Sequence, residues 1–255
     1  KMFELFEDIL LHTHFDDDKR LKEILNQLKS RLEMGFMSNG HSTAVNRAMS
    51  YFSQGSWYKE LVEGIAFYQF LCAILKDYDT RKAEIIHKLQ TIGQKIFRKS
   101  YLLADMTVDH EGMQICTKPL VSFAGKLYTA PMSAVDCAVK TIGTCPRHNE
   151  AFITSGMVQY NACAGNFGGS GMAYSGSMNV LKNVLGNEYL WNNVRVKGGA
   201  YGCMCGFAPS GNGYFTSYRD PNLAKTYDIY ANAADYVRSL TLDDRELTKY
   251  IIGAV

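Results

Sequence analysis

Apolar residues recur at helical spacing through the first hundred residues of the chain, with polar residues between them. Asp16, Asp17 and Asp18 precede the longest such stretch, where acidic side chains cap a helix and favour its N-terminus. A short apolar, partly β-branched run at 101–108 predicts a strand instead. The helices predicted by the spacing cover 2–11, Asp16 to Phe36, 41–51, Trp57 to about Lys76, and Thr80 to about Arg98.

The pattern changes in the second half. Periodicity is lost between Asp109 and Asn149, where prolines and glycines recur, so we expect a linker there and divide the chain into 1–115, 116–149 and 150–255. The later predictions are one or two strands in 151–164, a loop at 165–171, a helix capped by Ser170 or Ser175 and continuing to Leu185, a helical turn at 189–194, strands at 201–207 and 214–218 joined through Asn212-Gly213, a helix at 223–240 with Asp220 as N-cap and Pro221 at its first position, and a final helix opened by Thr241 and 243–246. Long helices mixed with antiparallel strands predict an α+β fold.

Composition narrows the function classes. The 27 Lys and Arg residues nearly balance 25 Asp and Glu, without a long basic run, which disfavours nucleic-acid binding. We find no run of eighteen apolar residues and no export signal, so we predict no membrane partner. The seven cysteines are scattered without a CxxC pair, which favours a reducing compartment; we therefore predict a cytoplasmic location, with an organelle as the alternative. Cys203 and Cys205 are expected on one strand face as small buried hydrophobes.

The common catalytic motifs are missing from the sequence. Neither HExxH nor HxxEH occurs, and His12 and His14 beside the three aspartates are better explained by helix capping and solvated charge than by a metal. The glycine-rich segment 165–171 has neither the Lys-Ser/Thr ending of an ATP loop nor GxGxxG spacing, so a flexible turn is favoured over a nucleotide site. We predict no metal site.

The segment from Arg195 to Tyr201 is the strongest candidate for binding. Arg195 offers a planar fork of donors, Tyr201 offers a neutral phenol, and Gly198 and Gly199 between them allow close approach of another backbone. This corner predicts a peptide-docking site with a glycine hinge. The alternative is a glycine that ends a helix, followed by a half-buried strand tyrosine.

Several longer segments resemble one known family. Segments 195–202, 217–223 and 242–253 look like the C-terminal half of presequence proteases, a branch of the insulinase/pitrilysin superfamily, and 16–23, 27–33 and 48–53 resemble the third domain and associated region of the same enzymes. The resemblance covers nearly the whole chain. It implies two related helix-plus-antiparallel-sheet domains, of which the second is truncated, and both ends of the chain look cut.

The resemblance also implies a function. Such enzymes are zinc metalloendopeptidases that degrade unstructured oligopeptides in a closed chamber, and their zinc motif lies in the N-terminal half. This chain is then expected to bind no zinc, to carry no catalytic residue for zinc chemistry, and to supply Arg195 and Tyr201 as substrate-clamping groups. Its partners would be peptide substrate and the N-terminal half of the same polypeptide; apolar surface left uncovered favours self-association. The alternative is an inactive homologue that acts as a peptide-binding scaffold.

Overall fold

The computed structural model describes residues 1–129, 142–146 and 149–254. The chain divides into two compact units, one formed by Lys1–Leu28 with Leu71–Thr141 and the other by Lys29–Phe70 with Ile142–Val255. Two helices, α2 (Asp18–Ser38) and α5 (Ile65–Lys76), contribute residues to both units. No helix in the described ranges combines the length and apolarity needed to cross a membrane.

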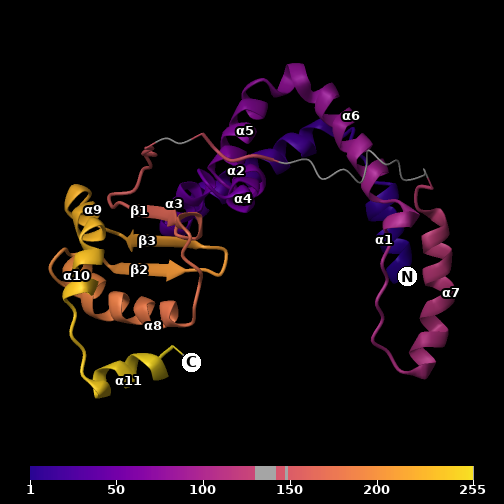
Figure 1. Cartoon of the computed structure of the whole chain (residues 1–255). Helices are drawn as coiled ribbons and strands as arrows, with labels where there is room; N and C mark the ends of the chain where they lie inside the picture. Colours follow the sequence, from indigo (N-terminus) through magenta and orange to yellow (C-terminus); the bar gives the residue numbers. More distant parts are fainter. Residues whose placement is uncertain (130–141, 147–148, 255) are drawn as a thin grey trace. The chain divides into compact units, whose positions relative to one another are not determined.

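The first unit is helical. It contains α1 (Met2–Leu11), the start of α2, the end of α5, α6 (Tyr78–Ile96), a 3-10 turn η1 (Lys99–Tyr101) and α7 (His110–Lys126) (Figure 1). The rings of Phe3 and Phe123 lie 5.8 Å apart and join α1 to α7. The hydroxyl of Tyr78 donates to the backbone carbonyl of Asp18 over 2.7 Å, which joins α6 to the start of α2. The predicted helices of this unit are confirmed.

Two expectations for the first unit are wrong. The predicted strand at 101–108 begins in η1 and continues as irregular chain, and Leu103 is 91% exposed. Its apolar content therefore does not reflect burial in a sheet. The expected linker begins with α7, where Asp109 accepts from the backbone of Gly112 and Pro119 lies inside the helix. That internal proline is the reason the pattern looked broken. The division at 115 and 149 stays a prediction.

The second unit combines helices with a small sheet. Its elements are the end of α2, α3 (Gly40–Ser50), α4 (Gln54–Glu63), the start of α5, β1 (Ala162–Asn166), η2 (Gly168–Ser170), α8 (Ser177–Val184), η3 (Leu185–Val196), β2 (Gly202–Phe207), β3 (Asn212–Tyr218), α9 (Ala224–Ala231), α10 (Ala233–Ser239) and α11 (Asp244–Ile252). The three strands are antiparallel in the order β1-β3-β2. The α+β class is confirmed, and the relation between two domains stays a prediction.

The core of the second unit lies against one face of this sheet. Cys205 and Phe215 are cross-strand partners that pack with buried residues of η3, α9 and α10, including Leu190, Val194 and Tyr230. Side chains alternate along a strand, so Tyr218 lies on the other face, where its ring meets His41 of α3 at 5.0 Å. The sheet therefore has helices on both faces, and Tyr218 lies beside α3.

Several predicted boundaries in this unit move. Only the end of 151–164 is a strand, since β1 begins at Ala162. The predicted helix at 57–76 is two helices separated at Gly64, where a Cβ atom would lie 2.4 Å from the carboxylate of Glu60. The hairpin turn uses Gly211, with φ 82°, and not Asn212-Gly213, which pairs within the sheet.

The helix caps also differ. Gly176 precedes α8, so neither predicted serine caps it. The predicted helix at 223–240 is two helices that meet at Asn232, and Leu223 precedes the first. Asp220 and Pro221 therefore do not start it. The opening of the last helix is confirmed by a capping box between Asp243 and Glu246.

Candidate functional site

The segment from Arg195 to Tyr201, which we call the η3–β2 corner, joins the end of a π-helix to the first strand of the hairpin. Gly199 has φ +81° and donates from its backbone to the carbonyl of Arg195 over 2.8 Å. A Cβ atom on Gly198 would lie 2.3 Å from the carbonyl oxygen of Val194. Both glycines are therefore required to end the helix this tightly. The helix-end alternative is correct for the glycines, but Tyr201 is 67% exposed and not half-buried.

The corner brings Arg195 and Tyr201 together. The guanidinium carbon of Arg195 lies 3.8 Å from the ring centre of Trp191 and 6.0 Å from that of Tyr201. Stacking on an aromatic face holds a guanidinium in place while leaving its edge free to donate. In the described part of the chain, Arg195 forms no hydrogen bond or ion pair, and neither does the hydroxyl of Tyr201. Both groups are available to a ligand.

A buried carboxylate positions this corner from behind. Asp220 is fully buried and accepts from the hydroxyl of Thr226 over 2.7 Å, the amide of Asn161 over 3.1 Å and the backbone of Asn222 over 2.8 Å. The side chain of Asn222 in turn donates to the carbonyl of Gly198 over 2.5 Å. The glycine pair is thus tied to a polar cluster inside the unit. Sequence reasoning missed this role, although Asp-Pro-Asn is a typical turn sequence.

Next to the corner, three tyrosine rings form a continuous row that we call the aromatic band: Tyr201, Tyr218 and Tyr160. The ring centres are 5.8 Å apart between Tyr201 and Tyr218, and 5.5 Å apart between Tyr218 and Tyr160. The backbone of Tyr201 also donates to the carbonyl of Arg219 over 3.2 Å. The far end of the band is therefore held to the corner through both side chains and backbone.

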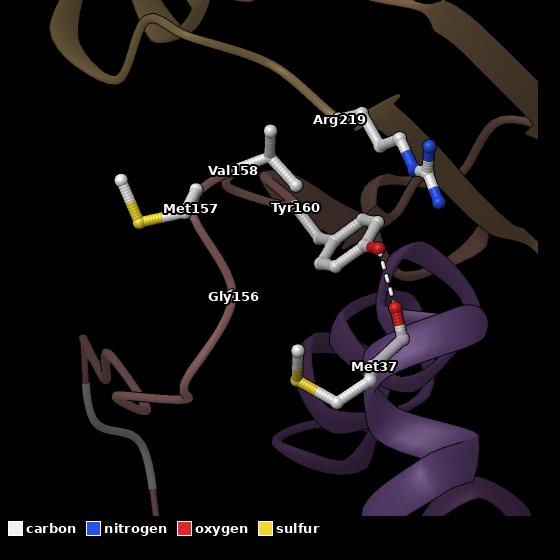
Figure 2. Close-up of a pocket in the computed structure, with 6 residues that line it drawn as sticks. All are labelled: Met37, Gly156, Met157, Val158, Tyr160 and Arg219. Atoms are coloured by element: carbon white, nitrogen blue, oxygen red, sulfur yellow. Dashed lines mark hydrogen bonds between the residues drawn. The ribbon is translucent and has the colours of Figure 1, made fainter.

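The aromatic band ends at a pocket that we call the methionine pocket. It measures about 240 Å³ and is lined by Met37, Gly156, Met157, Val158, Tyr160 and Arg219. Figure 2 shows the hydroxyl of Tyr160 directed at the backbone carbonyl of Met37, a hydrogen bond of 2.6 Å. The pocket is lined mainly by apolar side chains and carries a guanidinium on its rim.

The thiols near the corner are chemically quiet. Burial raises the pKa of Cys203 to about 11, against the opposing charge of Arg195, and burial raises the pKa of Cys205 to about 12. A protonated thiol is a poor nucleophile. The corner can therefore bind and donate hydrogen bonds, but it offers no cysteine for covalent chemistry.

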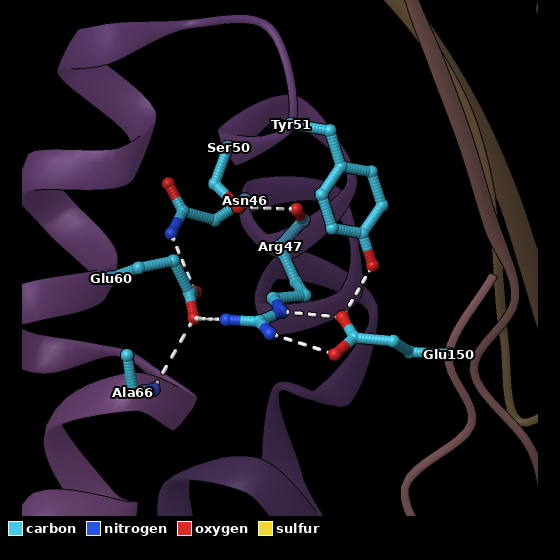
Figure 3. A network of polar contacts seen from close by, with 7 residues as sticks. All are labelled: Asn46, Arg47, Ser50, Tyr51, Glu60, Ala66 and Glu150. Atoms are coloured by element: carbon cyan, nitrogen blue, oxygen red, sulfur yellow. Dashed lines mark hydrogen bonds and ion pairs between the residues drawn. The ribbon is translucent and has the colours of Figure 1, made fainter. Parts of the chain in front are cut away.

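A second arginine in this unit is placed differently. Arg47 of α3 donates to Glu150 over 2.7 and 2.8 Å and to the fully buried Glu60 of α4 over 3.2 Å (Figure 3). The hydrogen bond to Glu150 is the main cause that raises the pKa of Arg47. Tyr51 also donates to Glu150. This network holds the segment at Glu150 against two helices and is structural.

Metal ligation has no basis in the described residues. No three His, Cys, Asp or Glu side chains converge there as a metal site. His12 lies 3.3 Å from Asp8, and His14 lies 3.6 Å from Asp16. The residues present do not fit the zinc implied by the resemblance, and the absence of zinc from the chain stays a prediction.

Comparisons with known proteins cover both units. The family model described as the PreP C-terminal domain matches residues 149–255, and a second model, described as peptidase-associated, matches residues 1–74. Protein HypA of Clostridium perfringens is 34% identical over the whole chain, which covers 26% of that protein. Presequence protease 1, chloroplastic/mitochondrial, of Arabidopsis thaliana is 32% identical over the whole chain and 23% of its own length. The mitochondrial presequence protease of Drosophila melanogaster is 26% identical over the whole chain and 24% of its own length. The chain thus spans about a quarter of each relative.

Proposed function

We propose, from the premise that this chain belongs to the presequence-protease family of metallopeptidases, that it supplies the peptide-clamping surface of a peptidase for unstructured oligopeptides. In this proposal, Arg195 and Tyr201 donate hydrogen bonds to the backbone carbonyls of a bound peptide. Gly198 and Gly199 act as the hinge that presents them. The chain performs no hydrolysis by itself and works with the N-terminal half of the same polypeptide.

One observation carries this proposal. Arg195 is held on the ring of Trp191 at 3.8 Å beside an exposed Tyr201, and within the described ranges neither polar group has a hydrogen-bond partner. Unpaired donors at a rigid, partly exposed corner are typical of a binding surface, because a purely structural arginine is normally paired. The buried cluster around Asp220 supports the same interpretation, since it fixes the backbone of the corner.

The chemistry expected at the corner is hydrogen-bond donation. A carbonyl oxygen gains negative charge as peptide hydrolysis begins, and donors aimed at that oxygen stabilise the transition state more than the ground state. The ligands for a catalytic metal would come from polypeptide outside this chain. The further expectations of two related domains and of a cytoplasmic enzyme belong to the same proposal.

The direct test measures cleavage and binding of an unstructured peptide by the full-length polypeptide that contains this chain. Arg195→Ala removes a charge-assisted donor and should weaken kcat/KM by about tenfold to a hundredfold. Tyr201→Phe removes only the hydroxyl and should cost about tenfold. The proposal fails if both variants keep the wild-type kcat/KM.

Matched controls separate binding from folding. Arg238→Ala removes an exposed arginine of α10 that pairs with Asp235 at 2.5 Å, and Tyr58→Phe alters a tyrosine of α4 that is 55% exposed. Both should leave kcat/KM and the denaturation midpoint unchanged. A decrease in kcat/KM with the controls as large as with Arg195→Ala would show that the assay reports general surface damage and would contradict a specific role of the corner.

A further inference from the structure

We propose that the methionine pocket binds one apolar side chain of the peptide whose backbone is held at Arg195 and Tyr201. This inference rests on the proposed function of the η3–β2 corner and deepens it by naming the substrate class. The occupant is an extended peptide segment that carries an aliphatic or similar apolar residue at one fixed position.

The lining of the pocket fits such a side chain. Met37 and Met157 contribute flexible thioethers, which adapt to side chains of different shape. The hydroxyl of Tyr160 is already bonded to the carbonyl of Met37, so its ring lines the pocket without an unpaired donor. The volume of about 240 Å³ is below the range of drug-sized sites and is suited to one side chain.

Two of these apolar residues are strongly exposed. Met157 is 98% exposed and Val158 is 39% exposed, while both face the same pocket. Covering such surface with an apolar group is favourable, at roughly 25 cal/mol per Å² removed from water. The pocket is therefore expected to gain affinity for a peptide from apolar contact, which complements the hydrogen bonds at the corner.

The aromatic band connects the pocket to the corner at a spacing that fits an extended chain. Steps of 5.8 and 5.5 Å separate the ring of Tyr201 from that of Tyr218, and the latter from Tyr160 at the pocket. An extended chain advances about 3.3 Å per residue. The residue in the pocket is therefore about three positions from the residue bound at Tyr201.

Charge at the two ends selects the same occupant. Arg219 lines the pocket, and Arg195 lies at the other end of the band. Guanidinium groups donate and do not accept, so they favour carbonyl oxygens or carboxylates and disfavour a lysine or arginine in the pocket. The carbonyl of Arg219 accepts from the backbone of Tyr201, and Arg219 itself is in the left-handed region at φ 49°, next to the buried Asp220. The rim of the pocket and the corner are thus built on one rigid segment.

The test uses the full-length polypeptide and fluorescein-labelled decapeptides of Gly and Ser, in which one Leu is moved through successive positions. A chelator stops metal-dependent cleavage, and affinity is measured by fluorescence anisotropy. One Leu position should bind about tenfold more tightly than the peptide without Leu. Met157→Asp should abolish this preference and instead favour Lys at the same position, because it places a carboxylate at the pocket.

Ile153→Asp is the matched control. Ile153 lies in the same irregular segment, is 100% exposed and is absent from the pocket lining, so its replacement should leave the position preference unchanged. Met157 is nearly as exposed, and its replacement is expected to leave the denaturation midpoint unchanged.

The outcomes separate the inference from the function beneath it. A Leu preference that survives Met157→Asp, or that Ile153→Asp removes equally, overturns the pocket assignment and leaves the clamp intact. A wild-type dimer that Met157→Asp dissociates would assign the surface to a second copy of the chain and would also overturn the inference. Peptide binding that Arg195→Ala leaves unchanged overturns the proposed function itself.

Discussion

Arg47 and Arg195 lie in the same unit and show two different uses of a guanidinium. Arg47 is 9% exposed and donates to two carboxylates from separate parts of the chain. Arg195 rests on Trp191 and, in the ranges that the structure describes, has no anionic partner. A buried charge must be paired where it lies, whereas a stacked, accessible charge can wait for a ligand. The comparison separates an arginine that holds the fold from one that is suited to binding.

The largest effect is expected at the buried network. Arg47→Ala leaves the fully buried Glu60 without its cation and should lower the free energy of unfolding by about 3–5 kcal/mol. Arg195→Ala, which breaks no pair, should change it by less than about 0.5 kcal/mol. Urea denaturation of the two variants measures the difference, and equal losses would contradict the division between the two arginines.

A smaller effect is expected at the cluster behind the corner. Asp220→Ala removes the acceptor for Asn161, Thr226 and the backbone of Asn222, and should cost roughly 2 kcal/mol of stability. Because Asn222 holds the carbonyl of Gly198, peptide affinity should fall as well. Asp235→Ala, which removes an exposed partner of Arg238, is the control and should change neither quantity. Lost stability with unchanged peptide affinity would show that the cluster does not position the corner.

The smallest effect concerns His41, which lies on the helix that also carries Arg47 and touches Tyr218 of the aromatic band. Burial lowers the pKa of His41 in the folded protein, and within the described residues its buried Nδ1 has no hydrogen-bond partner. A lowered folded pKa means that the unfolded chain binds the proton more readily. The associated stability is therefore present above about pH 6.5 and is lost as the pH falls from there toward the folded pKa.

Replacing the imidazole tests this sign. His41→Phe should make the free energy of unfolding less dependent on pH below about 6.5, while His87→Phe, on α6 of the other unit, should leave the wild-type slope. Stability of the wild type that rises on acidification through this range, and that His41→Phe abolishes, would contradict the assigned direction.

Much of the fold could be predicted from local pattern. The amphipathic stripes of the first hundred residues located the helices, and the alternation around Cys203 and Phe215 located the hairpin. The run at 101–108 failed because apolar composition does not show whether a partner strand exists. The helix from His110 was hidden by Pro119, which interrupts the sequence pattern while the helix itself continues.

The candidate site was only half visible in the sequence. Arg195 and Tyr201 could be found because the motif is short and local, and the structure brings their side chains together. The methionine pocket could not, since Met37 and Arg219 are far apart in the chain and meet only through the fold. Asp220 was taken as a helix cap because its partner Asn161 comes from a distant segment. Sites that depend on long-range contacts require the structure.

Trp191 provides the most direct measurement of the central claim. The chain has two tryptophans, so Trp57→Phe leaves Trp191, beneath Arg195, as its single indole. Titrating an unstructured peptide into this variant should give a saturable change in tryptophan fluorescence, and adding Arg195→Ala should remove it. Peptide binding that is seen by anisotropy but leaves the fluorescence of Trp191 unchanged would contradict the placement of the clamp at this corner.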